Sequence, residues 1–320
     1  MKPWKVYFEG SIWGHRGRDH AGREITVGKS FSWGNQIWTV PAVYVCARGL
    51  VLDICVSAEA EEMRAFVEKW LPYERMGDVP EEVREEMERQ YPLRMEGKAE
   101  LLCGRHRLRQ KRASGSGWLP ESCAVEGYRN GSEAEAFMSH YGLDRERAWA
   151  FRRVMFPWTT KRKPRQVREL TLCMEDGKMS YSGPHFSGQE EKVTFPHPIT
   201  GKEYTLTILG AEERELPEAY FQREDLEYPR RCVTLGYTVT PHHEGVQVRW
   251  CGKGDAPRGK EEGGKAAGAH AVGVILQKKS GEQQAASALY FTLPEKREWR
   301  VIIMEKVKED VEWRLFGEEK

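Results

Sequence analysis

The chain has 320 residues, of which 31% are charged and 39% hydrophobic, and its formal net charge at pH 7 is +1. Two domains are the more common arrangement at this length, and the apolar content with eleven tryptophans excludes a disordered chain. The nearly balanced charge gives no bulk electrostatic reason to expect a nucleic-acid or membrane partner.

No segment of the sequence is typical of export or of membrane insertion. The N-terminal stretch MKPWKVYFEG lacks the apolar core of a signal peptide. The best apolar run is interrupted by Arg48 and Asp53, far short of the ~20 residues that a membrane helix needs. The seven cysteines, an odd number without a CxxC pair, are typical of reduced thiols. We therefore expect a soluble cytoplasmic protein without a membrane partner.

The chain is expected to open with strands. Residues 3–13 predict a first strand, and a polar, glycine-containing loop follows it. Residues 24–38 then predict a short hairpin that turns at Gly34, because glycine tolerates the positive φ of hairpin turns.

A second hairpin and a helix form the clearest local pattern in the chain. The apolar runs 43–46 and 50–56 predict two strands that turn at Gly49. The period then changes, with an N-cap predicted at Ser57 and a stop at Pro72. The apolar stripe of this predicted helix consists of Met63, Phe66, Val67 and Trp70.

Three further helices are predicted before residue 160. They cover residues 79–91, 132–142 and 144–156, and each has a plausible cap or a proline or glycine stop. The SGSG sequence at 114–117 is typical of a flexible connector.

From residue 167 onward, apolar and polar residues alternate in about eight short segments. Such alternation is typical of antiparallel strands with one buried face. The predicted fold class is therefore α+β, with an N-terminal strand-hairpin-helix region (1–160) followed by an antiparallel β-rich sandwich or open barrel (161–320).

The loop GHRGRDH offers the first candidate metal ligands, which are His15, Asp19 and His20. Imidazole nitrogens and carboxylates bind zinc and iron. Their spacing matches no specific metal signature, however, and Arg16 and Arg18 would disfavour a cation. A solvated loop with locally paired charges is the alternative, and the pattern favours it.

A second group of candidates comprises His185, His197, and the neighbours His242, His243 and Glu244. All are expected in turns between strands, where binding loops gather. Adjacent side chains on extended backbone point in opposite directions, so at most one of His242 and His243 faces a given site. The alternative is a set of hydrated turn residues.

Two basic segments, 104–112 and 161–168, could bind phosphate groups if they lay side by side. Trp118, Tyr128 and Trp158 are near them in sequence and could stack on bases. A proline in the second segment and acidic residues nearby favour two separate, solvated segments instead. Nucleic-acid binding is accordingly the weaker hypothesis.

Asp53 interrupts the apolar run LVLDICV, where a carboxylate facing a core would need a partner. Arg48 is close enough in sequence to be considered as that partner. We expect Asp53 on an open face of the sheet rather than in a core.

The sequence contains no P-loop, no GxGxxG after a strand, no GxSxG and no HExxH motif. The leading hypothesis is a non-catalytic protein that binds a small molecule or another protein and has no cofactor. We expect no stoichiometric transition metal in protein purified without chelator or added metal. Whether the chain is an enzyme stays open. The alternative is a metal-dependent hydrolase whose ligands would be His15, Asp19, His20, His242 and Glu244.

Overall fold

The computed structural model groups the chain into two compact units, Met1–Lys178 with Lys306–Lys320, and Met179–Glu305. The sheets are mostly antiparallel and the helices are few, which confirms the predicted α+β class with a sandwich-like, β-rich architecture. The predicted division at residue 160 stays a prediction. The structure describes residues 4–15, 17–74, 79–123, 129–159, 167–221, 225–259 and 282–317.

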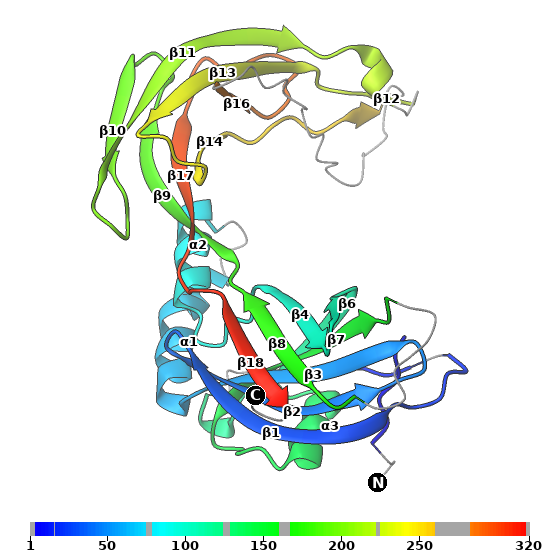
Figure 1. Cartoon of the computed structure of the whole chain (residues 1–320). Helices are drawn as coiled ribbons and strands as arrows, with labels where there is room; N and C mark the ends of the chain where they lie inside the picture. Colours follow the sequence, from blue (N-terminus) through cyan, green and yellow to red (C-terminus); the bar gives the residue numbers. More distant parts are fainter. Residues whose placement is uncertain are drawn as a thin grey trace. The chain divides into compact units, whose positions relative to one another are not determined.

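The first unit is built on two antiparallel sheets (Figure 1). One has the strand order β1-β2-β3-β7-β6 and the other the order β18-β8-β4-β5. Its elements are β1 (Arg23–Trp33), β2 (Gln36–Val45), β3 (Gly49–Ala58), α1 (Ala60–Glu74), α2 (Glu81–Gln90), β4 (Lys98–Cys103), β5 (His106–Arg109), β6 (Arg112–Trp118), η1 (Glu121–Cys123), α3 (Ser132–Tyr141), β7 (Ala148–Pro157), β8 (Leu170–Glu175) and β18 (Val311–Phe316).

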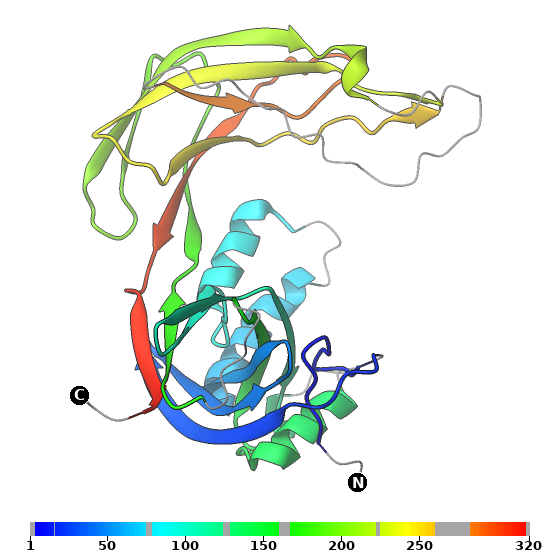
Figure 2. The same cartoon turned by 45° about the vertical axis from the view of Figure 1, so that its right-hand side comes forward.

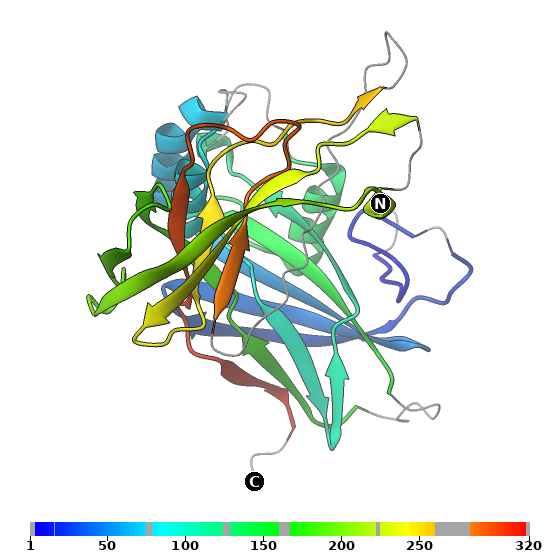
Figure 3. The same cartoon turned by 90° about the horizontal axis from the view of Figure 1, so that it is seen from above.

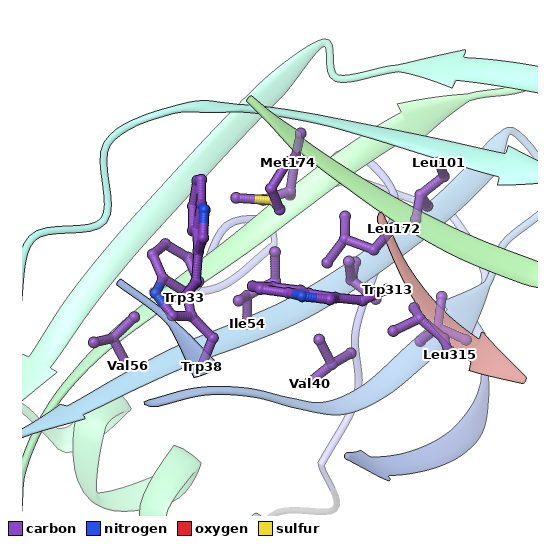
Figure 4. Close-up of a cluster of buried hydrophobic side chains, with 14 of the residues drawn as sticks. Trp33, Trp38, Val40, Ile54, Val56, Leu101, Leu172, Met174, Trp313 and Leu315 are labelled. Carbon is purple, nitrogen blue, oxygen red and sulfur yellow. The ribbon is translucent and has the colours of Figure 1, made fainter. Parts of the chain in front are cut away.

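The main core of this unit lies between the two sheets. Figure 4 shows Trp38 and Ile54 of the first sheet together with Leu172 and Trp313 of the second, all within one buried cluster. The ring of Trp313 stacks on Phe31 at 4.8 Å between centroids, where β1 and β18 come together. Burial of each large apolar side chain in this core contributes about 1.5–3 kcal/mol.

Strand β3 is buried along its whole length because both of its faces are covered. On one face, Ile54 and Val56 belong to the core between the sheets. On the other face, Cys55 packs with Phe137 of α3, which lies below the sheet in Figure 2. This double cover explains why the sequence of β3 is almost continuously apolar rather than alternating.

The two predicted hairpins are confirmed. The β1–β2 hairpin turns at Gly34, whose φ is +60°, and the β2–β3 hairpin turns at Arg48-Gly49. A Cβ on Gly49 would lie 2.2 Å from the carbonyl oxygen of Phe156, so the close approach of β7 requires glycine there.

Helix α1 was correctly predicted, but both of its ends differ from the prediction. Strand β3 runs to Ala58, so Ser57 lies within the strand and is not the N-cap. Pro72 lies inside the last turn, and the helix continues to Glu74. Pro72 lacks the N–H that would bond to the preceding turn, and the helix ends two residues after it.

The helices α2 and α3 are also confirmed, whereas three other local predictions are wrong. Residues 144–156 form no helix, because most of them belong to strand β7 between β3 and β6. β7 is buried on both faces, and its clustered apolar residues resemble a helical stripe. The predicted connector 114–117 lies in edge strand β6, and the described residues of 3–13 form a covering segment with a single isolated bridge.

The second unit contains the alternating strands that the sequence predicted. Two sheets, β10-β11-β13-β16 and β14-β17-β9, enclose its core, and β12 pairs with β15. Figure 3 shows the long strands β11 and β13 side by side. The elements are β9 (Lys178–Phe186), β10 (Lys192–Pro196), β11 (Glu203–Glu215), η2 (Glu218–Tyr220), β12 (Leu226–Glu227), β13 (Arg231–Thr240), β14 (Val246–Trp250), β15 (Arg258–Gly259), β16 (Gln283–Ala286) and β17 (Trp299–Lys306).

None of the helices in the described part of the chain combines the length and the apolar composition that crossing a lipid bilayer requires.

Candidate functional site

His185 of β9, Cys251 directly after β14 and Glu298 directly before β17 come together beside the β14-β17-β9 sheet. Successive side chains of a strand point to opposite faces, and each of these residues adjoins a buried aromatic residue of the core. Backbone pairing joins two of them, since the N–H of Cys251 donates to the carbonyl of Glu298 at 2.9 Å. The three buried neighbours are Phe186, Trp250 and Trp299.

The polar atoms of these three residues converge; we call them the Cys251 cluster. Nδ1 of His185 lies 2.9 Å from Oε1 of Glu298 and 3.8 Å from Sγ of Cys251. Nζ of Lys296 lies 3.3 Å from the other carboxylate oxygen, Oε2. Hydrogen bonds from His185 and then Lys296 lower the pKa of Glu298, so this carboxylate is ionised at neutral pH.

This geometry differs from that of a catalytic relay. In a Cys–His–acid relay, one imidazole nitrogen faces the nucleophile and the other faces the carboxylate. Here the same nitrogen, Nδ1 of His185, faces both Cys251 and Glu298. Three donor atoms that all lie within 4.8 Å of one another suit a shared central cation better than a proton relay.

A second cluster, the Glu305 cluster, consists of His197, His243 and Glu305. Nε2 of His243 lies 2.8 Å from Oε1 of Glu305, and Nε2 of His197 lies 3.4 Å from the same oxygen. His197 is 4% exposed, and the two other side chains are each 22% exposed. The turns that follow β10 and β13 therefore bring both histidines to the end of β17.

Backbone hydrogen bonds decide the protonation pattern of the Glu305 cluster. The N–H of Thr200 donates to Nδ1 of His197 at 3.2 Å, and the N–H of Gly245 donates to Nδ1 of His243 at 3.0 Å. A ring nitrogen that accepts a hydrogen bond carries no proton, so each neutral ring is protonated at Nε2. Histidines that bind metal through Nε2 instead donate from Nδ1. The Glu305 cluster is therefore two N–H groups donating to one carboxylate.

The second unit also contains a hollow of about 540 Å³ near the start of β13, which we call the aromatic hollow. The rings of Phe221 and Tyr228 stack there at 4.9 Å between centroids. Arg230 donates to Oε1 of Glu215 at 2.7 Å, and Phe291 also lines the hollow. The sequence alone did not reveal this hollow, because its residues come from two separate parts of the chain, 215–231 and 290–291, and none belongs to a known motif.

The first predicted group of metal ligands does not form a cluster in the structure. The ring of His15 stacks on Tyr7 at 4.2 Å, and His20 is exposed. Nε2 of His15 and Oδ2 of Asp19 are shielded from solvent and have no hydrogen-bond partner. Among the described residues, neither of the three-donor groups contains any of these side chains. Their role in metal binding stays a prediction.

The predicted pair His242 and His243 is separated as the backbone argument requires. His243 points to Glu305, whereas His242 and Glu244 are exposed and belong to neither three-donor group of the described residues. His185 lies within strand β9 and not in a turn, so that part of the prediction is wrong. Metal binding by His242 and Glu244 stays a prediction.

The expectation that Asp53 lies on an open sheet face is wrong. Asp53 is fully buried and accepts two hydrogen bonds from Arg153, at 2.8 and 2.7 Å, and one from the hydroxyl of Tyr141 at 2.7 Å. Arg48, the partner considered from the sequence, pairs with Glu9 instead. Pairing of β3 with β7 places Asp53 opposite Arg153, a contact between residues too distant in sequence for a local pattern to reveal.

The first basic segment is partly neutralised within its own sheet. Glu100 of β4 pairs with Arg107 at 2.7 Å and with Arg109 at 3.4 Å. Residues 161–166 of the second segment, and Tyr128, lie outside the described residues. The predicted separation of the two segments stays a prediction.

Comparisons of the chain with models of protein families, with curated proteins and with solved structures find no match.

Proposed function

We propose that this chain is a non-catalytic binding protein, and that a small polar molecule with a flat apolar face binds in its aromatic hollow. The observation that carries the proposal is the combination of a stacked pair, Phe221 and Tyr228, with an arginine–glutamate pair in one concave site. Small-molecule sites commonly measure 300–1,000 Å³ and combine aromatic walls with a few placed polar groups.

The chemistry of the lining selects the ligand class. An aromatic ring face contacts another flat apolar face well, while Arg230 and Glu215 offer hydrogen bonds to hydroxyl, amide or carboxylate groups. Sugars, nucleosides and aromatic amino acids have both properties. A purely apolar ligand would displace water from the guanidinium and the carboxylate without replacing the hydrogen bonds that this water made.

Two buried thiols and both histidine clusters support a non-catalytic role. Burial raises the pKa of Cys46 to about 11 and that of Cys55 well above its usual range, which makes both thiols unreactive at neutral pH. Neither histidine cluster has the geometry of a proton relay. All seven cysteines are free thiols, which supports the cytoplasmic location that we include in the proposal.

Ligand-observed NMR tests this function with three probes, D-glucose, adenosine and N-acetyltyrosine. We expect saturation transfer to at least one probe, and loss of that signal in the variant Arg230→Gln. The matched control is Arg214→Gln, because Arg214 also forms a surface pair, with Glu212 at 2.9 Å, but does not line the hollow. If no probe binds, or if both variants lose binding equally, the proposal is wrong.

A further inference from the structure

Outside the aromatic hollow, the Cys251 cluster combines a thiol, an imidazole and a carboxylate. These are the three side-chain types that bind Zn²⁺ in proteins. His185 lies in β9, Cys251 directly follows β14 and Glu298 directly precedes β17, so three strands of one sheet bring the three residues together. We propose that these three residues bind one transition-metal ion, Zn²⁺ in preference to Mg²⁺ or Ca²⁺.

Two of the distances between the donor atoms lie near those of a tetrahedral ion, and all three are within 4.8 Å. With ordinary zinc–ligand bond lengths of about 2.0–2.3 Å, tetrahedral geometry separates nitrogen from sulfur by about 3.6 Å and nitrogen from oxygen by about 3.4 Å. The corresponding distances are 3.8 Å from His185 Nδ1 to Cys251 Sγ and 2.9 Å to Glu298 Oε1. Small rotations of the exposed side chains, which move the donor atoms by a few tenths of an ångström, accommodate the ion.

The hydrogen-bonding pattern distinguishes this cluster from the Glu305 cluster. Nδ1 of His185 points to the carboxylate and the thiol, so loss of its proton leaves a lone pair aimed at the centre of the cluster. In the Glu305 cluster, backbone N–H groups use the Nδ1 lone pairs of both histidines, which leaves protons on the nitrogens that face Glu305. Of the two three-donor groups among the described residues, the Cys251 cluster is therefore the one whose ring nitrogen, thiol and carboxylate oxygen face one another.

The donor set also predicts which metal binds and how tightly. A thiolate with an imidazole favours Zn²⁺ and Co²⁺ over the oxygen-seeking Mg²⁺ and Ca²⁺. Binding converts the Cys251 thiol to a thiolate and releases its proton to solvent. His185 and Glu298 are 41% and 39% exposed, and the ion therefore exchanges readily with chelators.

This accessible site reconciles the inference with the sequence-based expectation of no stoichiometric metal. That expectation concerned protein purified without added metal, and it rested on the absence of a ligand spacing. Cys251 and Glu298 lie 66 and 113 residues after His185 in the chain, so no local spacing could reveal the three ligands.

Cobalt titration of chelator-treated, full-length protein tests the proposal. We expect one equivalent of Co²⁺ to produce a thiolate-to-cobalt charge-transfer band, and one equivalent of Zn²⁺ to abolish it. The variants Cys251→Ser and His185→Gln should lose the band, and calorimetry should show at least tenfold weaker Zn²⁺ binding. Circular dichroism spectra matching wild type confirm that the variants are folded.

Two control variants make the result specific. Cys173→Ser removes another partly exposed thiol that lies near a carboxylate, at 3.8 Å from Glu312, and His243→Gln alters the Glu305 cluster. Both controls should keep the band. A wild-type protein without the band, a band retained in Cys251→Ser, or a band lost in Cys173→Ser would each overturn the proposal. Because none of these residues lines the aromatic hollow, the outcome is independent of the proposed small-molecule binding.

Discussion

Replacement of Asp53 by alanine should be among the most destabilising single changes in the first unit. The Asp53 carboxylate is fully buried and receives three hydrogen bonds, two from Arg153 and one from Tyr141. Burial works against the charge of Arg153, but the adjacent carboxylate outweighs it and raises the pKa of the guanidinium. Asp53→Ala therefore leaves a permanently charged, 4%-exposed side chain without its counterion.

The expected cost is about 3–5 kcal/mol in the free energy of unfolding, which is the range for removing one partner of a buried ion pair. A Coulomb estimate agrees, since two unit charges ~4 Å apart interact by about 4 kcal/mol at an effective dielectric constant of 20. Replacement of both partners, as in Asp53→Leu with Arg153→Met, should cost less than Asp53→Ala alone, because no buried charge is left unpaired.

Urea unfolding followed by tryptophan fluorescence measures this effect, because all tryptophans except Trp250 and Trp299 lie in the first unit. The control is Arg48→Ala, which breaks the exposed pair with Glu9 and should cost about 0–1 kcal/mol. If Asp53→Ala shifts the unfolding free energy no more than Arg48→Ala does, or if the double variant is the less stable of the two Asp53 variants, the reasoning is refuted.

Two further predictions concern a loop carboxylate and a core aromatic residue. Hydrogen bonds from backbone N–H groups, that of Ser187 first, lower the pKa of Glu190 to about 2. The ionised Glu190 therefore stabilises the fold fully above the unfolded-state pKa of about 4.3, and this stabilisation disappears as the pH falls through 2. The stability difference between wild type and Glu190→Gln in urea titrations should accordingly shrink between pH 5 and pH 2, and a difference that does not change with pH contradicts the assignment. Phe137→Ala should cost about 3–5 kcal/mol in the free energy of unfolding, because this fully buried ring packs on Phe151 at 4.2 Å between centroids. The control Trp13→Ala, at a 63% exposed residue, should cost less than about 1 kcal/mol. Equal losses of stability in thermal or urea unfolding would show that the packing argument is wrong.

Local sequence patterns predicted the elements whose signals lie within a few residues. Hairpin turns depend on a glycine at one position, as at Gly34, and the stripe of helix α1 depends on a spacing of three and four residues. Alternation along β13 and β14 predicted strands with one buried face for the same reason. These features are properties of a short segment in contact with one apolar surface, so the sequence sufficed to predict them.

Features that depend on partners distant in the chain were decided by tertiary structure. Strand β7 resembles a helix in sequence because both of its faces are buried, one in the core between the two sheets and the other against α3. It therefore lacks the alternation of a strand that is exposed on one side. Asp53 was expected on an open face, yet the register of β3 against β7 places it opposite Arg153.

The candidate sites show the same limit. His185 was recognised as a possible ligand from the sequence, but Cys251 and Glu298 were not. Cys251 and Glu298 lie near His185 because β14, β17 and β9 are adjacent in one sheet. The side chains next to them in sequence are buried in the core, which leaves these three outside it. Residue types and local periods are encoded along the chain, whereas strand order and register arise only when the whole core packs, and these bring the three donor atoms together.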